Sequence, residues 1–238
     1  MSRIVAIVPA AGLGTRMGAD KPKQYLELDG VPLVIFTLRR LAGSASITDF
    51  IIATRTEDLS TFQDRVSRAR LGRPARVVAG GETRQHSVGN ALAQVPGEVE
   101  IVVVHDAVRP FVTPEQVDRV ISEARSRGAA ILGIPAVDTI KEVKRASLPE
   151  DVALITQTIP RERVVLAQTP QAFSHALLKE AFAKAHEDGI VASDEAALVE
   201  RMGRDVFVVL GSERNLKITR PADMDLARFY LEQEHQKA

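Results

Sequence analysis

Short runs of aliphatic residues recur along the chain, and amphipathic segments separate them. The runs are continuous rather than alternating, which is typical of strands that are covered on both faces. They span residues 4–8, 50–53, 76–79, 101–104, 130–134 and 206–210. Because helical segments lie between these strands, we predict an α/β fold with a mostly parallel sheet and helices on both of its faces.

The intervening segments carry helix signals. Thr113-Pro-Glu-Gln116 offers a capping residue, a proline suited to the first helical position and a glutamine that completes a capping box. Ser174 and Ser193 are the expected caps of two later helices, and Pro221 is expected to open the last one. We predict helices over residues 31–41, 88–95, 114–128, 176–185 and 194–202, and from residue 221 onward.

One segment departs from this alternation of strands and helices. Residues 138–144 alternate between apolar and polar side chains, residues 145–151 resemble a turn, and residues 152–159 form a second β-like run. A hairpin without a covering helix is marginally stable alone. We therefore expect residues 136–167 to form a β-arm that projects from a single domain of residues 1–238 and buries its apolar side against a second copy of the chain. A hairpin folded onto its own domain stays open as the alternative.

Charge and cysteine content narrow the classes of function. The 238 residues include 31 Lys and Arg and 31 Asp and Glu, a neutral balance that speaks against nucleic acid or an anionic membrane as a partner. The chain has no cysteine, which excludes disulfides, thiolate zinc sites and a cysteine nucleophile and fits a cytoplasmic location. No apolar run approaches the roughly 20 residues of a membrane-spanning helix.

A turn rich in small residues follows the first predicted strand directly. Its sequence is Pro9-Ala-Ala-Gly-Leu-Gly-Thr-Arg-Met17. In open parallel sheets ligands bind at the carboxyl ends of strands, and such a turn exposes backbone N–H groups that bind phosphate. The glycine spacing matches neither the dinucleotide fingerprint nor the NTPase loop. Arg16 and Lys23 would supply cations for a triphosphate, with a solvated basic loop as the structural alternative.

Three further segments are expected at the same edge of the sheet. Gly80-Gly-Glu-Thr-Arg84 follows the third predicted strand, and its arginine, together with Ser87, can bond a phosphate or a base. Asp106 follows the fourth strand, where a carboxylate commonly contacts Mg²⁺; its alternative role is to cap a helix and pair with Arg109. Lys217 precedes the last helix and can bind a second anionic group or be solvated. No G-x-S-x-G motif is present, and the five histidines show no metal or catalytic spacing.

Taken together, these segments resemble the 2-C-methyl-D-erythritol 4-phosphate cytidylyltransferase family of the non-mevalonate isoprenoid pathway. The resemblance runs from Val5 to about Tyr230. Besides the turn after the first strand, the matching pieces are Pro22-Lys-Gln-Tyr25, Gly80-Gly-Glu-Thr-Arg-Gln-His-Ser-Val88, His105-Asp-Ala-Val-Arg-Pro110, Asp138-Thr-Ile-Lys141, Gln168-Thr-Pro-Gln-Ala-Phe173, Ser193-Asp-Glu-Ala196 and Lys217-Ile-Thr-Arg-Pro221. The resemblance implies a Rossmann-like fold of the nucleotide-diphospho-sugar transferase type, and transfer of CMP from CTP to the sugar phosphate with release of pyrophosphate.

The resemblance also implies roles for individual residues. Arg16 and Lys23 would stabilise the transition state at the α-phosphate, and Asp106 would lie by a Mg²⁺ ion that is bound with the CTP phosphates. The residues implied to bind CTP are Ala10, Ala11, Gly12, Gly14, Gly81, Glu82, Ser87, Asp106, Ala107 and Arg109. Those implied to bind the sugar phosphate are Thr139, Arg161, Thr169, Ser193 and Lys217, with Thr139 and Arg161 reaching across from the partner's arm in a homodimer.

Two positions depart from the family's usual residues. Family members often carry Asp and Thr where this chain has Glu82 and Ser193, and both replacements keep the polar function. Two alternatives stay open. A ribitol-5-phosphate cytidylyltransferase shares the glycine turn, the Pro-Lys-Gln run and the sheet, and a non-catalytic nucleotide-binding module would keep the site without turnover.

Overall fold

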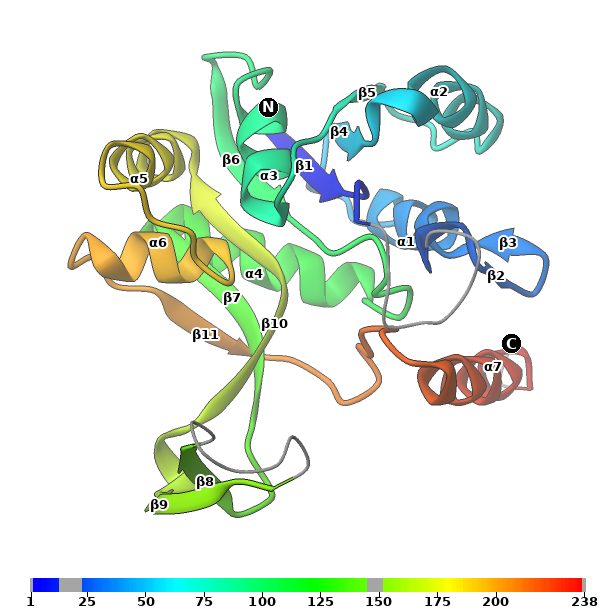
Figure 1. The fold of residues 1–238 in the computed structure, drawn as a ribbon. Coiled ribbons are helices and arrows are strands. Elements are labelled where there is room, and N and C mark those ends of the chain that lie inside the picture. Colours follow the sequence, from blue (N-terminus) through cyan, green and yellow to red (C-terminus); the bar gives the residue numbers. More distant parts are fainter. Residues whose placement is uncertain (1, 13–22, 145–151, 237–238) are drawn as a thin grey trace.

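A seven-stranded sheet forms the centre of the molecule (Figure 1). The computed structural model describes residues 2–12, 23–144 and 152–236. The strand order is β11-β7-β10-β6-β1-β4-β5. Six strands run in the same direction and match the six predicted runs: β1 (Arg3–Pro9), β4 (Asp49–Thr54), β5 (Ala75–Ala79), β6 (Val99–Val104), β7 (Ala129–Pro135) and β11 (Phe207–Leu210). The predicted α/β fold is confirmed.

The seventh strand, β10 (Val165–Ser174), runs antiparallel between β6 and β7. No local sequence pattern predicts this strand. Its centre, Gln168-Thr-Pro-Gln171, is polar and interrupts the apolar pattern that marks a buried strand, and the ladder with β7 shifts register there. Gln168, Thr169 and Gln171 are nevertheless buried, because they belong to the polar network of the functional site described below.

Helices cover both faces of the sheet, as predicted. One layer consists of α1 (Leu33–Ala42), α2 (Leu59–Arg68) and α4 (Pro114–Arg127), and the other of α3 (Arg84–Leu92), α5 (His175–Glu187) and α6 (Glu195–Arg201). Alternate residues of β1 divide between them: Ile4, Ala6 and Val8 contact the first layer, and Val5 and Ile7 contact the second. This division explains why the strands are aliphatic at every position.

The last helix, α7 (Pro221–His235), lies apart from these two layers. It packs with the short strand β2 (Glu27–Leu28), which pairs with β3 (Val31–Pro32), and with the loop after β6. The buried side chains of this third cluster include Leu28, Leu33, Val108, Phe111, Ile218, Met224 and Leu231. No helix in the described part of the chain is long and apolar enough to cross a membrane.

The helix termini test the predicted caps. Thr113 caps α4 through the predicted capping box, and Pro221 is the first residue of α7. Ser174 occupies the cap position of α5, although its side chain makes no capping bond. The prediction for Ser193 is wrong, because the cap of α6 is Asp194, whose carboxylate accepts the N–H of Ala197. Helix α2 was not predicted.

The predicted β-hairpin is present. β8 (Ile140–Lys144) pairs antiparallel with β9 (Leu154–Ile159) in a two-stranded sheet of their own. Figure 1 shows this hairpin at the far end of β7 and β10, away from the main sheet. The short helix η4 (Arg161–Arg163) leads from the hairpin into β10, and the predicted turn at residues 145–151 lies outside the described residues.

Candidate active site

A cavity of about 240 Å³ lies at the carboxyl edge of the sheet. The loops after β1, β5 and β6 form three of its walls, since these parallel strands end at the same edge. The lining residues are Pro9, Ala10, Ala11, Gly12, Gln24, Gly81, Glu82, Thr83, Arg84, Ser87, Asp106, Ala107, Val108 and Lys217.

The loop after β1 is fixed from both sides. The N–H of Ala10 donates to the carbonyl of Ala53 (2.7 Å), and the carbonyl of Ala10 accepts from Nε2 of Gln24 (2.7 Å). Gln24 is 2% exposed and belongs to the short helix η2 (Lys23–Tyr25). The turn of small residues and the segment that begins at Lys23 are thereby held together.

Glycines allow the loop after β5 to approach this first wall. A Cβ atom on Gly80 would lie only 2.6 Å from Cβ of Ala11, so that no side chain fits there. The hydroxyl of Ser87 accepts the N–H of Gly81 (3.1 Å) and donates to the carbonyl of Thr83 (2.9 Å). Ser87 therefore shapes this wall from within, using the hydroxyl that was predicted to face a ligand.

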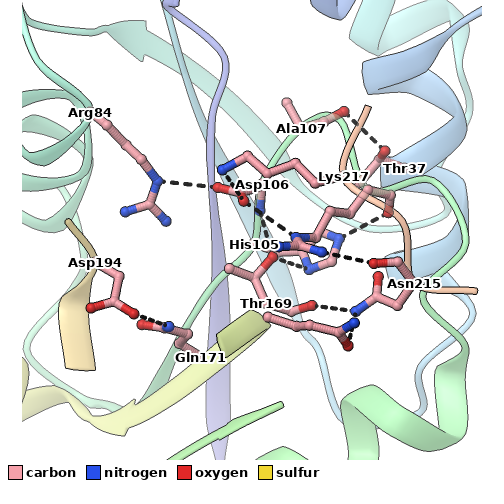
Figure 2. Close-up of polar contacts among 12 residues, drawn as sticks. Thr37, Arg84, His105, Asp106, Ala107, Thr169, Gln171, Asp194, Asn215 and Lys217 are labelled. Carbon is pink, nitrogen blue, oxygen red and sulfur yellow. Dashed lines mark hydrogen bonds and ion pairs between the residues drawn. The ribbon is translucent and has the colours of Figure 1, made fainter. Parts of the chain in front are cut away.

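Asp106 is at the centre of the third wall (Figure 2). Its Oδ1 accepts from Nε of Arg84 (3.1 Å), and its Oδ2 lies 2.8 Å from Nζ of Lys217 and 3.4 Å from Nε of Arg109. Burial alone would raise the pKa of the Asp106 carboxyl, but the three cations outweigh it and hold this pKa well below its usual range. One ionised carboxylate thus gathers cations from α3, from the loop after β6 and from the segment before α7.

A buried polar network supports Asp106 from behind. Nε2 of His105 lies 3.1 Å from the carbonyl of Arg109, and because a carbonyl only accepts, Nε2 carries the hydrogen. The hydroxyl of Thr169 lies 3.1 Å from the remaining nitrogen of His105 and accepts the N–H of Asp106 (3.0 Å). Burial lowers the pKa of His105 to about 4, so this imidazole is neutral near pH 7.

The same network joins the loop after β6 to three other elements. The side chain of Asn215 donates from Nδ2 to the backbone carbonyl of Thr169 (2.8 Å). The backbone carbonyl of Asn215 accepts from Nη1 of Arg109 (2.7 Å). Thr37 of α1 donates to the carbonyl of Ala107 (3.0 Å). The loop that carries Asp106 is therefore bonded to β10, to α1 and to the segment before α7 (Figure 2).

The structure brings many of the predicted site residues together and leaves others apart. Those that line the cavity are Ala10, Ala11, Gly12, Gly81, Glu82, Ser87, Asp106, Ala107 and Lys217. Arg109 and Thr169 lie buried behind Asp106, whereas Ser193 is exposed before α6 and Thr139 and Arg161 are exposed on the arm. Gly14 and Arg16 lie outside the described residues, as does the side chain of Lys23.

Several residues of the site received no role from the sequence, among them Gln24 and Glu195. Gln24 anchors the loop after β1, and Glu195, which is 1% exposed, accepts from Nη1 of Arg84 with both carboxylate oxygens (2.8 and 3.0 Å). Both stand inside quoted motifs, Pro22–Tyr25 and Ser193–Ala196. Their position in those motifs was the one sequence signal of a functional role. Sequence alone does not distinguish a buried polar side chain from a solvated one.

A cavity at the carboxyl edge of an α/β sheet, lined by loops of small residues and by the cations Arg84 and Lys217, fits the class of α/β nucleotidyltransferases. Comparison of the sequence with known protein families identifies one family within this class. The family model of 2-C-methyl-D-erythritol 4-phosphate cytidylyltransferase (IspD) matches residues 4–233. The chain therefore belongs to this family, and the resemblance read from its motifs is confirmed.

Relatives and solved structures agree with this assignment. The chain is 50% identical to the 2-C-methyl-D-erythritol 4-phosphate cytidylyltransferase of Acidobacterium capsulatum, over 97% of this chain and 98% of the relative. It is 46% identical to the same enzyme of Solibacter usitatus, over 98% of this chain and 97% of that relative. Among solved structures, the Anaerococcus prevotii 4-diphosphocytidyl-2C-methyl-D-erythritol synthase superposes with a TM-score of 0.82 at 30% identity, covering 97% of this chain and 99% of that one. The Thermus thermophilus 2-C-methyl-D-erythritol 4-phosphate cytidylyltransferase superposes with a TM-score of 0.77 at 35% identity, covering 98% of this chain and 100% of that one.

Proposed function

We propose that the cavity at the carboxyl edge is where this chain performs the reaction of its family. That reaction transfers the cytidylyl group of CTP to 2-C-methyl-D-erythritol 4-phosphate and releases pyrophosphate, in isoprenoid precursor biosynthesis. The observation that carries the assignment is the cluster of three cations around Asp106 beside the turn of small residues. Backbone N–H groups and fixed cations are what a triphosphate requires.

CTP would occupy the space between the loops after β1 and β5. Ala10, Ala11, Gly12 and Gly14 would wrap the nucleotide, and Gly81, Glu82 and Ser87 would face the cytosine. Ala107, Asp106 and Arg109 would lie toward the ribose and the phosphates. The exclusion of side chains at Gly80 supports this placement, because it lets backbone groups of both loops reach one ligand.

The chemical step needs charge stabilisation more than proton transfer. An oxygen of the acceptor's 4-phosphate attacks the α-phosphorus of CTP, a new phosphorus–oxygen bond forms, and the bond to the β-phosphate breaks as pyrophosphate leaves. The attacking phosphate is already ionised near pH 7, so that no general base is required. We assign Arg16 and Lys23 to stabilise the charge that develops at the α-phosphate. In this mechanism, catalysis comes from positioning and electrostatics.

The acceptor would bind next to Asp106. Lys217 is 2.8 Å from the Asp106 carboxylate and 36% exposed, so an incoming phosphate can reach its ammonium group. Thr169 and Ser193 would complete this end of the site. Thr139 and Arg161 would come from the arm of a second copy, since both are exposed and neither lines the cavity of their own chain.

Magnesium is the cofactor proposed for this site. The described residues include no group of three or more His, Asp or Glu side chains arranged to hold a metal ion. They fit an ion that is held chiefly by the triphosphate, with Asp106 as its protein contact, because Mg²⁺ keeps several waters and commonly uses one or two carboxylates plus substrate phosphates. When bound, the ion neutralises charge on the phosphates.

The homodimer and the cytoplasmic location complete the proposal. The hairpin pairs only with itself among the described strands, and it exposes large apolar side chains that a soluble monomer would leave in water. These are Val143 (44%), Val152 (48%), Leu154 (61%) and Ile155 (57%). A second copy of the chain, seated on this arm, would bury them. The absence of cysteine fits a reducing cytoplasm.

A matrix of nucleotides and acceptors tests the proposed function. CTP, UTP, ATP and GTP are each combined with 2-C-methyl-D-erythritol 4-phosphate or ribitol 5-phosphate, and pyrophosphate release is measured with magnesium and with a chelator. We expect turnover with CTP and methylerythritol phosphate and its loss with the chelator. Preference for ribitol 5-phosphate would contradict the acceptor, and no release in any combination would leave a binding module.

A further inference from the structure

Arg84 connects two acidic side chains that come from different parts of the fold. It is the first residue of α3, and its Nη1 donates to both oxygens of Glu195 (2.8 and 3.0 Å). Its Nε donates to Oδ1 of Asp106 (3.1 Å), as Figure 2 shows. The guanidinium therefore spans a buried anchor on one side and the central carboxylate of the cavity on the other.

Glu195 is a rigid anchor. The start of α6 is held by Gln171 of β10, which accepts the N–H of Ala196 through Oε1 (3.1 Å) and donates from Nε2 to Asp194 (2.8 Å). Glu195 itself is 1% exposed, and Arg84 is its ion-pair partner among the described residues. Since a buried carboxylate is very unfavourable without a partner, losing Arg84 would be costly for Glu195, which favours keeping this ion pair.

The two oxygens of Asp106 are divided between different cations. Oδ1 is held by Arg84, whereas Oδ2 lies 2.8 Å from Lys217 and 3.4 Å from Arg109. Arg84 thus fixes the rotation of the carboxylate and takes up part of its charge. Without Arg84 the carboxylate is free to turn both oxygens toward Lys217 and to bind that ammonium group more strongly.

We propose that Arg84 and Glu195 are positioning residues for the acceptor, which hold Asp106 so that Lys217 can leave it for the acceptor's phosphate. This inference rests on the proposed role of Lys217. Glu195 fixes Arg84, Arg84 fixes one oxygen of Asp106, and the remaining attraction between Asp106 and Lys217 is weak enough for a dianionic phosphate to replace it. The pair acts more strongly on affinity for the acceptor than on affinity for CTP.

The test uses two variants that avoid an unpaired buried charge. Arg84→Lys keeps the positive charge, but a lysine is shorter and ends in a single ammonium group, so it does not bind Asp106 and Glu195 at once. The double variant Arg84→Gln with Glu195→Gln removes both charges together. For each variant we expect the KM for methylerythritol phosphate to rise about tenfold, and to rise at least as much in the double variant as in Arg84→Lys. The changes in kcat and in the KM for CTP should be several times smaller than this rise. Acceptor affinity, measured by calorimetry beside a non-hydrolysable CTP analogue, should fall in parallel.

A control pair and a second background separate positioning from folding. Arg125→Gln with Glu100→Gln removes an exposed ion pair of the same chemistry and should leave every parameter unchanged. In a Lys217→Ala background, the double variant at positions 84 and 195 should add no further loss of acceptor affinity. An additive loss, or an unchanged acceptor affinity in the double variant, would overturn the inference. If Lys217→Ala alone leaves acceptor affinity unchanged, the proposed role of Lys217 fails first and the inference falls with it.

Discussion

Asp106 shows how a buried charge can organise a cavity for a highly anionic ligand. Alone it would repel phosphate, yet Arg84, Arg109 and Lys217 surround it, and together with Glu195 the described cluster has one more cation than anions. Arg16 and Lys23 add two further cations in the sequence. Removing one partner from such a cluster is costlier than its net contribution suggests, because a charge is left buried and unpaired.

Lys23 is the residue whose replacement should affect the chemistry most plainly. We expect Lys23→Ala to lower kcat by about two to three orders of magnitude, the usual effect of removing one group that stabilises transition-state charge. Steady-state pyrophosphate release measures this effect. Lys179→Ala, on the exposed face of α5, is the matched control. Near-wild-type turnover of the Lys23 variant would remove this residue from the chemical step.

His105 predicts how stability depends on pH. Its folded pKa, about 4, lies below its ordinary value of 6.5, so protonation favours the unfolded chain. The stability contributed by the neutral His105 is fully present above about pH 6.5 and is lost as the pH falls toward 4. At pH 5 this loss amounts to about 2 kcal/mol. We expect His105→Gln, although less stable at pH 7.5, to lose about 2 kcal/mol less than the wild type between pH 7.5 and pH 5. Urea unfolding at both pH values measures this; equal losses would contradict the neutral buried imidazole.

The short helix η2 is an element whose stability comes from side chains at its end. The hydroxyl of Tyr25 donates to Asp58 (3.0 Å) and lies 3.2 Å from the hydroxyl of Thr54, while its ring packs on Phe62 with centroids 5.8 Å apart. Together with the bond from Gln24 to Ala10, these contacts fix the backbone on which Lys23 sits.

Tyr25→Phe tests whether η2 positions Lys23. We expect kcat to fall severalfold, because the end of η2 loses its tether, while the free energy of unfolding changes by only about 1 kcal/mol for a part-buried hydrogen bond. Turnover and urea unfolding are compared with Tyr230→Phe, the other tyrosine of the chain, whose ring packs on Phe111. Equal turnover in the two variants would show that η2 needs no such tether.

Elements with strong local patterns could be predicted from the sequence, and those defined by tertiary contacts could not. The aliphatic runs and the capping box at Thr113 follow from nearest neighbours, and both appear in the structure. β10 has a polar centre that is buried only because His105, Asp106 and Asn215 bond to it, and no local pattern contains those partners. The site follows the same division: the loops were predicted, but the bond that Arg84 donates to Glu195 joins residues far apart in the chain.

In the proposed dimer, the projecting arm would make the assembly part of the site. Burying a large aliphatic side chain fully contributes about 1.5–3 kcal/mol, so covering the exposed side chains of β8 and β9 would favour association. We expect Leu154→Ser with Ile155→Ser to convert a dimer to a monomer in sedimentation and to lower acceptor turnover, because Thr139 and Arg161 no longer reach the partner's site. Val191→Ser, an equally exposed position on the body, is the control. A wild-type monomer, or an undiminished dimer in the variant, would contradict the arm's role.

The placement of CTP is the claim on which the other assignments depend. A crystal structure of the protein soaked with CTP and magnesium tests it most directly. The account predicts nucleotide density in the cavity between Ala10–Gly12 and Gly81–Ser87, with the phosphates beside η2 and the loop after β6. Density for CTP at any other part of the molecule, with this cavity empty, would contradict it.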